Sequence, residues 1–209
     1  RKRSRLSSVR EWEGPMDWPS RVFRRGRDEW LSRTMRHRLR GRPPGLDLFS
    51  DDRSRFAGQL LPALQEADVV HLHWVARFVD VAAVLSRLRR PVVWTLHDQQ
   101  AFTGGCHYDM DCGRCRTGCG QCPQLGQPSA WDFSARSWER KKRAYAEVPG
   151  EFTVVTPSRW LGKLVTESPL LGDKRVEVIP YGVPTKTYYP GGREGLRRAF
   201  GLEERDRAL

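Results

Sequence analysis

The sequence predicts an α/β fold: a Rossmann-like parallel sheet with helices on both faces and a cysteine-rich loop inserted after one strand. Three observations predict it. Short β-branched runs alternate with helical patterns, the strands are almost continuously apolar, and all five cysteines fall within residues 106–122. Near-continuous apolar strands separated by helices are typical of a parallel sheet that is covered on both faces.

The predicted elements beyond residue 55 alternate between helix and strand. In chain order they are a helix over 56–67, a strand over 69–74, a helix over 79–88, a strand over 92–96, a loop over 97–129, a helix over 131–147, a strand over 152–156, a helix over 157–167 and a strand over 176–179. Ser158 is well placed to cap the last of these helices.

Residues 1–43 form an arginine-rich segment, with 14 Lys/Arg against 5 Asp/Glu, and they carry most of the net charge of +12. Apolar side chains recur among the arginines at near-helical spacing: Phe23, Trp30, Leu31, Met35 and Leu39. We favour an ordinary helix with its apolar stripe packed inward. The alternative is a basic amphipathic helix lying on an anionic membrane surface.

The composition also restricts the partners and the location. No apolar run approaches the roughly 20 residues of a membrane span, and no secretion signal follows the charged start. We therefore expect a cytoplasmic protein. Peripheral binding at the inner face of the cell membrane is a further option. Nucleic acid is not the expected partner, because the basic residues are not interleaved with aromatics in a recognisable module. The missing initiator Met and the end at Leu209 indicate a truncated chain.

Polar residues stand at the ends of two predicted strands. His97 and Asp98 directly follow the strand over 92–96, and ligands of parallel α/β sheets bind beyond the carboxyl ends of the strands. A neutral imidazole there can bond a substrate hydroxyl or a developing charge, with Asp98 fixing its tautomer or a neighbouring hydroxyl. A structural histidine is the alternative. His71 and His73 share one strand face, and function and structure explain them equally well.

The cysteine loop contains two C-x-x-C pairs, Cys112 with Cys115 and Cys119 with Cys122, preceded by Cys106. Tetrahedral zinc takes four thiolate or imidazole ligands, so five cysteines and His107 exceed one site. A closed structural zinc is the favoured interpretation, and disulfides or free thiols are the alternatives. The spacing differs from that of bacterial iron–sulfur ferredoxins.

Six segments, taken in chain order, resemble the motifs of a known family. They are ADVVHLHW (67–74), PVVWTLHD (91–98), AFTGGCHY (101–108), CGQCPQL (119–125), VTPSRWL (155–161) and VIPYGV (178–183). Together they resemble glycosyltransferase family 4, of the retaining GT-B fold, and within it the exopolysaccharide and colanic-acid type. The resemblance covers roughly residues 42–202. It departs from the family pattern at Pro184, where Asp is usual, and no glycine-rich loop is recognisable before Arg42.

The resemblance implies two Rossmann-like domains across a cleft. In this chain, 1–43 is then a partial start, 44–190 the acceptor-side domain, and 191–209 the truncated beginning of the linker and donor domain, so that the chain alone is not expected to turn over. The implied donor is a nucleotide-sugar and the acceptor a sugar or lipid-linked glycan in surface polysaccharide biosynthesis, with retention and without a catalytic metal. The alternative function is a non-catalytic zinc-bearing module that binds nucleic acid or protein.

The resemblance also implies the site residues. They are His97 and Asp98 for catalysis; His73, Trp74, Gly104, Gly105, Ser158, Tyr181 and Gly182 for the acceptor or substrate; and Cys106, Cys112, Cys119 and Cys122 for the metal, which leaves Cys115 as the spare cysteine.

Overall fold

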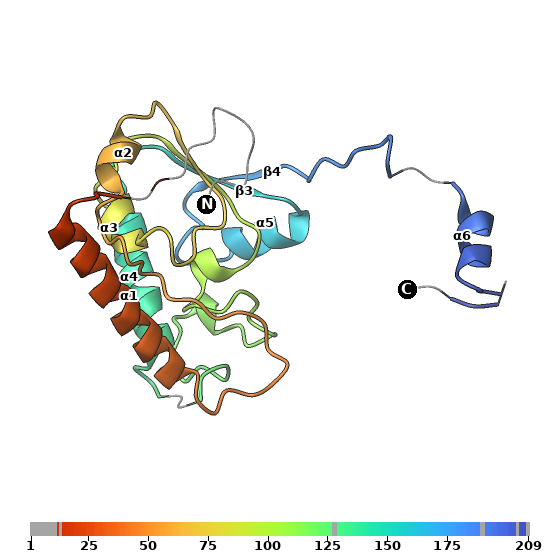
Figure 1. Ribbon diagram of the computed structural model, residues 1–209, viewed down its shortest axis with the longest axis horizontal. Helices are drawn as coiled ribbons and strands as arrows, with labels where there is room; N and C mark the ends of the chain where they lie inside the picture. The colour runs from red at the N-terminus through yellow and green to blue at the C-terminus, as the bar shows by residue number, and fades with distance from the viewer. Residues whose placement is uncertain (1–11, 13, 127–128, 189–190, 204, 208–209) are drawn as a thin grey trace. The chain divides into compact units, whose positions relative to one another are not determined.

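A computed structural model describes residues 12, 14–126, 129–188, 191–203 and 205–207 (Figure 1). The chain divides into two compact units between Ile179 and Pro180. In the second unit a single helix, α6 (Arg193–Ala199), is described. Among the described helices, none combines the length and the apolar character needed to cross a bilayer.

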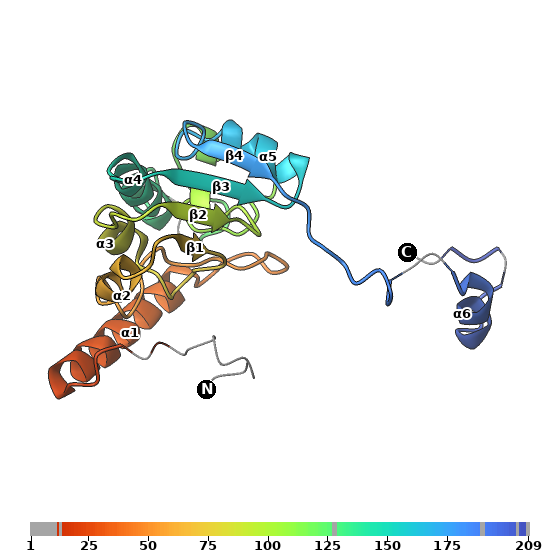
Figure 2. The same ribbon diagram turned by 90° about the horizontal axis from the view of Figure 1, so that it is seen from above.

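The first unit is built on a parallel sheet of four strands, seen side by side in Figure 2. The strands are β1 (Val70–Leu72), β2 (Val92–Thr95), β3 (Phe152–Thr156) and β4 (Arg175–Val178), and they lie in the order β1-β2-β3-β4. The register pairs Leu72 with Trp94, and Trp94 with Val154. The predicted α/β class is therefore confirmed, and the carboxyl ends of β1 and β2 lie at the same edge.

The helices that connect the strands are α3 (Val81–Leu85), α4 (Phe133–Ala146) and α5 (Arg159–Thr166). Their apolar residues share one core cluster with the alternate strand residues Leu72 and Trp94. Strands added one after another in the same direction place right-handed crossovers on a single side of the sheet. Within the described residues these three helices accordingly cover one face, whereas the sequence predicted helices on both faces. On the other face, His71 is exposed and Thr95 half-buried.

Several predicted elements are shorter in the structure than in the sequence pattern. The predicted helix over 56–67 is reduced to α2 (Leu61–Gln65), because residues 55–60 form turns in which Ala57 has φ +48°. The predicted strand over 69–74 ends at Leu72, which leaves His73 and Trp74 in the following loop. The loop over 97–129 contains two short 3₁₀ turns, η1 (Gln100–Phe102) and η2 (Arg114–Arg116).

Side chains cap the longer helices. Asp132 accepts the backbone N–H groups of Ser134 and Ala135 at the start of α4. Ser158 accepts the N–H of Leu161 at 3.2 Å, so the predicted cap of α5 is confirmed. Such caps satisfy backbone donors that have no partner inside the helix.

Helix α1 (Trp18–Arg38) spans most of the described part of the arginine-rich segment. The predicted apolar stripe is divided in the structure. Leu31 is buried, and Met35 and Leu39 pack against a small core formed by Phe49, Cys106, Cys122, Leu125 and Phe133. Phe23 and Trp30, by contrast, are each 49% exposed. The inward-packed stripe is thus correct only for the second half of the helix.

Candidate functional site

Three of the predicted strand-end residues, Trp74, His97 and Asp98, line a common pocket, whereas the predicted substrate residue His73 does not. Because β1 and β2 are parallel and in register, Trp74 and the pair His97 and Asp98 emerge at the same edge. They line an open pocket of about 300 Å³, which is at the lower end of the size range of small-molecule sites. Its full lining is Asp47, Leu48, Trp74, His97, Asp98, His107 and Tyr108.

Asp98 is bonded to His107. Its Oδ2 lies 2.7 Å from His107 Nδ1, and its Oδ1 accepts the backbone N–H of Gln100 at 2.8 Å. His107 Nε2 lies 2.9 Å from the hydroxyl of Ser50. A carboxylate only accepts hydrogen bonds, so Nδ1 carries a proton, and in the neutral ring Nε2 then accepts from the hydroxyl of Ser50. His107 is 2% exposed, and this chain fixes its orientation at the base of the pocket.

Trp74 forms an exposed wall of the pocket. Its side chain is 58% exposed, and its ring meets the His107 ring edge to face, with centroids 5.8 Å apart. The indole Nε1 lies 3.4 Å from His107 Nδ1. Both nitrogens carry a proton in the tautomer set by Asp98, so this approach is a packing contact. Tyr108 is 39% exposed, so the pocket offers two aromatic surfaces.

Sequence reasoning did not assign His107, Tyr108 or the segment around Asp47 and Leu48 to this site. A long-range pairing brings them there. An antiparallel bridge joins Phe49 to Cys106, and His107 donates its backbone N–H to the carbonyl of Leu48 at 3.1 Å. No local pattern marks that pairing, although His107 lies in the same motif as two predicted glycines.

Three histidines form a row on the open face of the sheet. His71 Nε2 lies 2.8 Å from Thr95 Oγ1, and His73 Nδ1 lies 3.1 Å from His97 Nε2. Their rings are near neighbours, with centroids 4.4 Å apart for His71 and His73 and 5.3 Å apart for His73 and His97. Burial, followed by the charge of His73, lowers the pKa of His71. The contact with His73 therefore orients the ring of His97.

Gly104 and Gly105, which were predicted to bind the substrate, lie where a larger side chain would not fit. A Cβ on Gly104 would lie 2.5 Å from the carbonyl oxygen of Ser134. Gly105 has φ +137°, and a Cβ there would lie 2.5 Å from the ring of Phe49. Both residues are buried, and neither lines the pocket around His97. The close approach at both positions supports the fold of the loop.

The remaining predicted substrate residues lie elsewhere. The hydroxyl of Ser158 caps α5. Tyr181 and Gly182 are exposed residues of the second compact unit.

The five cysteines line one small pocket, of about 10 Å³, together with Gly104, Gly120 and Ser134. All five are free thiols. Burial raises the pKa of Cys106 to about 12 and that of Cys115 to about 11, and it also raises the pKa of Cys119 and Cys122. In the part of the chain that the structure describes, no three His, Cys, Asp or Glu side chains are grouped to hold a metal ion.

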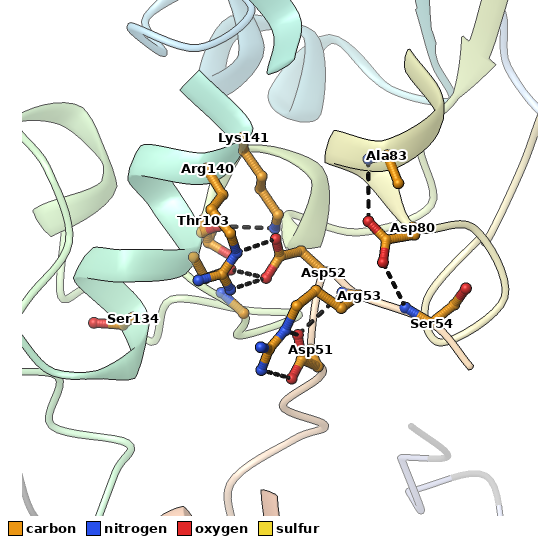
Figure 3. A network of polar contacts seen from close by, with 12 residues as sticks. Asp51, Asp52, Arg53, Ser54, Asp80, Ala83, Thr103, Ser134, Arg140 and Lys141 are labelled. Carbon is orange, nitrogen blue, oxygen red and sulfur yellow. Dashed lines mark hydrogen bonds and ion pairs between the residues drawn. The ribbon is translucent and has the colours of Figure 1, made fainter. Parts of the chain in front are cut away.

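A buried ionic network ties the start of the cysteine loop to α4 (Figure 3). Asp52, 2% exposed, accepts from Ser137 Oγ at 2.8 Å and from Arg140 Nε at 2.9 Å. Lys141 is completely buried and donates to the carbonyl oxygens of Gln100 and Thr103. Burial lowers the pKa of Lys141, while Asp52 favours its charged form. The network thereby holds the segment that follows Asp98.

In a comparison with protein families, the model of Glycosyltransferase Family 4 matches residues 17–187, which is most of the chain. The matched range includes the sheet, the pocket around His97 and the cysteine loop. No curated protein matches the chain, and no solved structure does.

Proposed function

This chain belongs to glycosyltransferase family 4, and on that premise we propose that it binds the acceptor of a sugar transfer whose donor is a nucleotide-sugar. The acceptor is a glycan or lipid-linked sugar of surface polysaccharide biosynthesis, and the transfer proceeds with retention. A second domain of the GT-B type binds most of the donor.

The observation that carries this proposal is the pocket at the carboxyl ends of β1 and β2. It combines two exposed aromatic surfaces, Trp74 and Tyr108, with polar groups on His97 and Asp98. A sugar ring has apolar C–H faces and a rim of hydroxyls, so it suits a site with flat aromatic walls and a few fixed polar groups.

Each side chain then has a distinct role. His97, held by His73 at 3.1 Å, contacts the transferred sugar and stabilises charge that develops during transfer. Asp98 and His107 act as one rigid unit that shapes the base of the pocket. The indole N–H of Trp74 donates to an acceptor hydroxyl, because His107 Nδ1 is itself a donor. The acceptor's own hydroxyl is the nucleophile, so no side chain of this domain needs to form a covalent bond.

Acceptor binding is testable with the chain itself by following indole N–H resonances during titration with mono- and oligosaccharides. We expect the Trp74 resonance, identified with a Trp74→Phe variant, to shift on saturable sugar binding. The Trp160 indole, 57% exposed on α5, serves as the matched control. His97→Ala should change this binding little, because the proposed contacts of His97 are with the transferred sugar and with charge that develops only during transfer. Equal shifts at Trp74 and Trp160, or none with any sugar, would contradict the proposed pocket.

We also propose that the cysteine loop holds a structural zinc ion through Cys106, Cys112, Cys119 and Cys122. The residue types suit zinc, because five free thiols line one small pocket, although no three of the described side chains are grouped as ligands in this arrangement. The nearby charge of Lys141 partly offsets the effect of burial, which raises the pKa of Cys106 and Cys119. Bound zinc would close a long loop and add folding free energy.

Metal analysis of purified variants tests the ligand set. We expect about one zinc ion per chain, lost in Cys112→Ser and retained in Cys115→Ser. Because the pKa of Cys106 is raised to about 12, zinc must displace protons when it binds, so affinity should fall as the pH falls. Equal zinc loss from both variants would refute this choice of ligands.

A further inference from the structure

A second hollow, of about 260 Å³, lies where the end of α1 meets the start of α4. It shares no lining residue with the pocket around His97. Its volume is below the range of sites for drug-sized ligands, so it suits a small molecule. The side chains that line it include basic, aromatic and hydroxyl groups, among them Arg38, Ser129, Trp131, Phe133 and Arg136.

Four arginines are crowded around this hollow. Burial lowers the pKa of Arg38, and the nearby charge of Asp51 opposes that effect. Three other guanidiniums lower the pKa further, those of Arg53, Arg136 and Arg140. Repulsion between like charges is stronger where water is partly excluded. An anion bound among these guanidiniums would therefore be stabilised by the same low dielectric.

Two of the four arginines have a carboxylate of their own. Arg53 forms a bidentate pair with Asp51, with N–O distances of 2.8 and 2.9 Å. Arg140 binds Asp52 through Nε at 2.9 Å. The other two arginines are the ones that line the hollow, and within the described part of the chain neither has an ion-pair partner. Two positive charges thus remain without a matching negative charge.

The carboxylate in the lining, that of Asp132, is already occupied. Its Oδ2 accepts the backbone N–H of Cys122 at 2.8 Å. Its Oδ1 accepts the backbone N–H groups of Ser134 and Ala135 and the hydroxyl of Ser134. Asp132 is 5% exposed, so its charge serves the start of α4 and the cysteine loop rather than the hollow.

The guanidinium of Arg38 has hydrogen-bonding capacity to spare. It lies 4.4 Å from the centre of the Phe133 ring, a cation–π contact that holds its plane in place. Its Nη1 is buried and has no hydrogen-bond partner among the described residues. A buried donor without an acceptor costs free energy. Arg136 is held nearby, since its Nη1 donates to the carbonyl of Trp131 at 2.9 Å.

We propose that this hollow binds the phosphate group of a small phosphate ester. Guanidinium groups present planar arrays of donors that match phosphate oxygens. A phosphate monoester carries close to two negative charges at neutral pH, which balances the charges of Arg38 and Arg136. The ring of Trp131, 61% exposed, offers an apolar surface to the organic part of the ligand, and Ser129 offers a hydroxyl.

Indole N–H resonances test this site with the chain itself. The Trp131 resonance, identified with a Trp131→Phe variant, should shift saturably with glucose 6-phosphate and with inorganic phosphate. Glucose, and sodium chloride at the same ionic strength, should leave it in place. The Trp160 resonance should not move. A shift of Trp74 without one of Trp131 would overturn this proposal and leave the acceptor pocket standing, so the two proposals fail separately.

Charge variants test the ligand contacts. Arg136→Gln should weaken binding of glucose 6-phosphate about tenfold, the scale of one charge-assisted hydrogen bond. Arg38→Lys should weaken it as well, because an ammonium keeps the charge but loses the planar donor array. Arg143→Gln removes the same charge two turns further along α4 and should leave binding within a few-fold. Arg136 and Arg143 are exposed, so both Gln variants should melt like the parent. Equal losses in these two variants, or a Trp131 shift that sodium chloride reproduces, would overturn the proposal.

Discussion

Replacing Asp52 with alanine is expected to destabilise the chain by about 3–5 kcal/mol, the usual cost of removing one partner from a buried ion pair. The variant removes the ion-pair partner of Arg140, which has 23% of its side chain exposed, and the negative charge that favours the charged form of the completely buried Lys141. The loss is large because Asp52 is almost completely buried and the charge of Lys141 stays in a low-dielectric interior. Urea unfolding at neutral pH, analysed with a shared slope, measures the effect.

Two companion variants distinguish an electrostatic cause from a loss of packing. Asp173→Ala removes an exposed partner of Lys174, and it should change the unfolding free energy by less than about 1 kcal/mol. Asp52→Ala/Lys141→Met removes the stranded cation as well and should recover part of the loss. If Asp52→Ala costs no more than Asp173→Ala, the buried network does not stabilise the fold.

The same carboxylate should give stability a defined pH dependence. Burial alone would raise the pKa of Asp52, but the hydrogen bonds and charge of Arg140, with Lys141 and Ser137, hold it below the ordinary value. A lowered folded pKa contributes stability that is fully present above the unfolded pKa of about 3.9 and is lost as the pH falls through the folded pKa. The parent should therefore lose this contribution in acid, and Asp52→Ala should show less of that loss.

In an enzyme that joins this domain to a donor-binding domain, His97→Ala is expected to lower kcat by about 100-fold. The reason is positional: His97 lies at the pocket, beyond the end of β2, and is bonded to His73 at 3.1 Å. An interaction made only with developing charge lowers kcat and kcat/KM together. Steady-state transfer rates over a range of acceptor concentrations provide the measurement.

His71→Ala is the matched control for His97→Ala. His71 belongs to the same row of histidines but bonds Thr95 at 2.8 Å and does not line the pocket. Its loss should leave kcat within a few-fold of the parent value. Near-normal turnover of His97→Ala would assign His97 a structural role. Equal losses of kcat in both variants would mean that the three histidines affect turnover indirectly, by supporting the sheet.

The local elements follow from the sequence because their signals are local. Apolar β-branched runs define β2 and β3, and a serine at the right offset caps α5. The turns over 55–60 escape such patterns, because apolar spacing alone does not reveal the positive φ of Ala57. The sequence pattern also does not show that only the second half of the apolar stripe of α1 packs inward. That packing depends on contacts with Phe49 and Phe133, which are distant in the sequence.

The sequence by itself determined the fold class, the family resemblance, and the placement of His97 and Asp98 at the end of a strand. Each depends on near neighbours in the chain or on ordered motifs. Only the tertiary structure decided that Asp98 bonds His107, that Ser50 completes that chain, and that Asp52 lies against Arg140. Those pairs join residues up to 88 positions apart, and such contacts form only when the whole core packs, because no local pattern encodes which distant side chains meet.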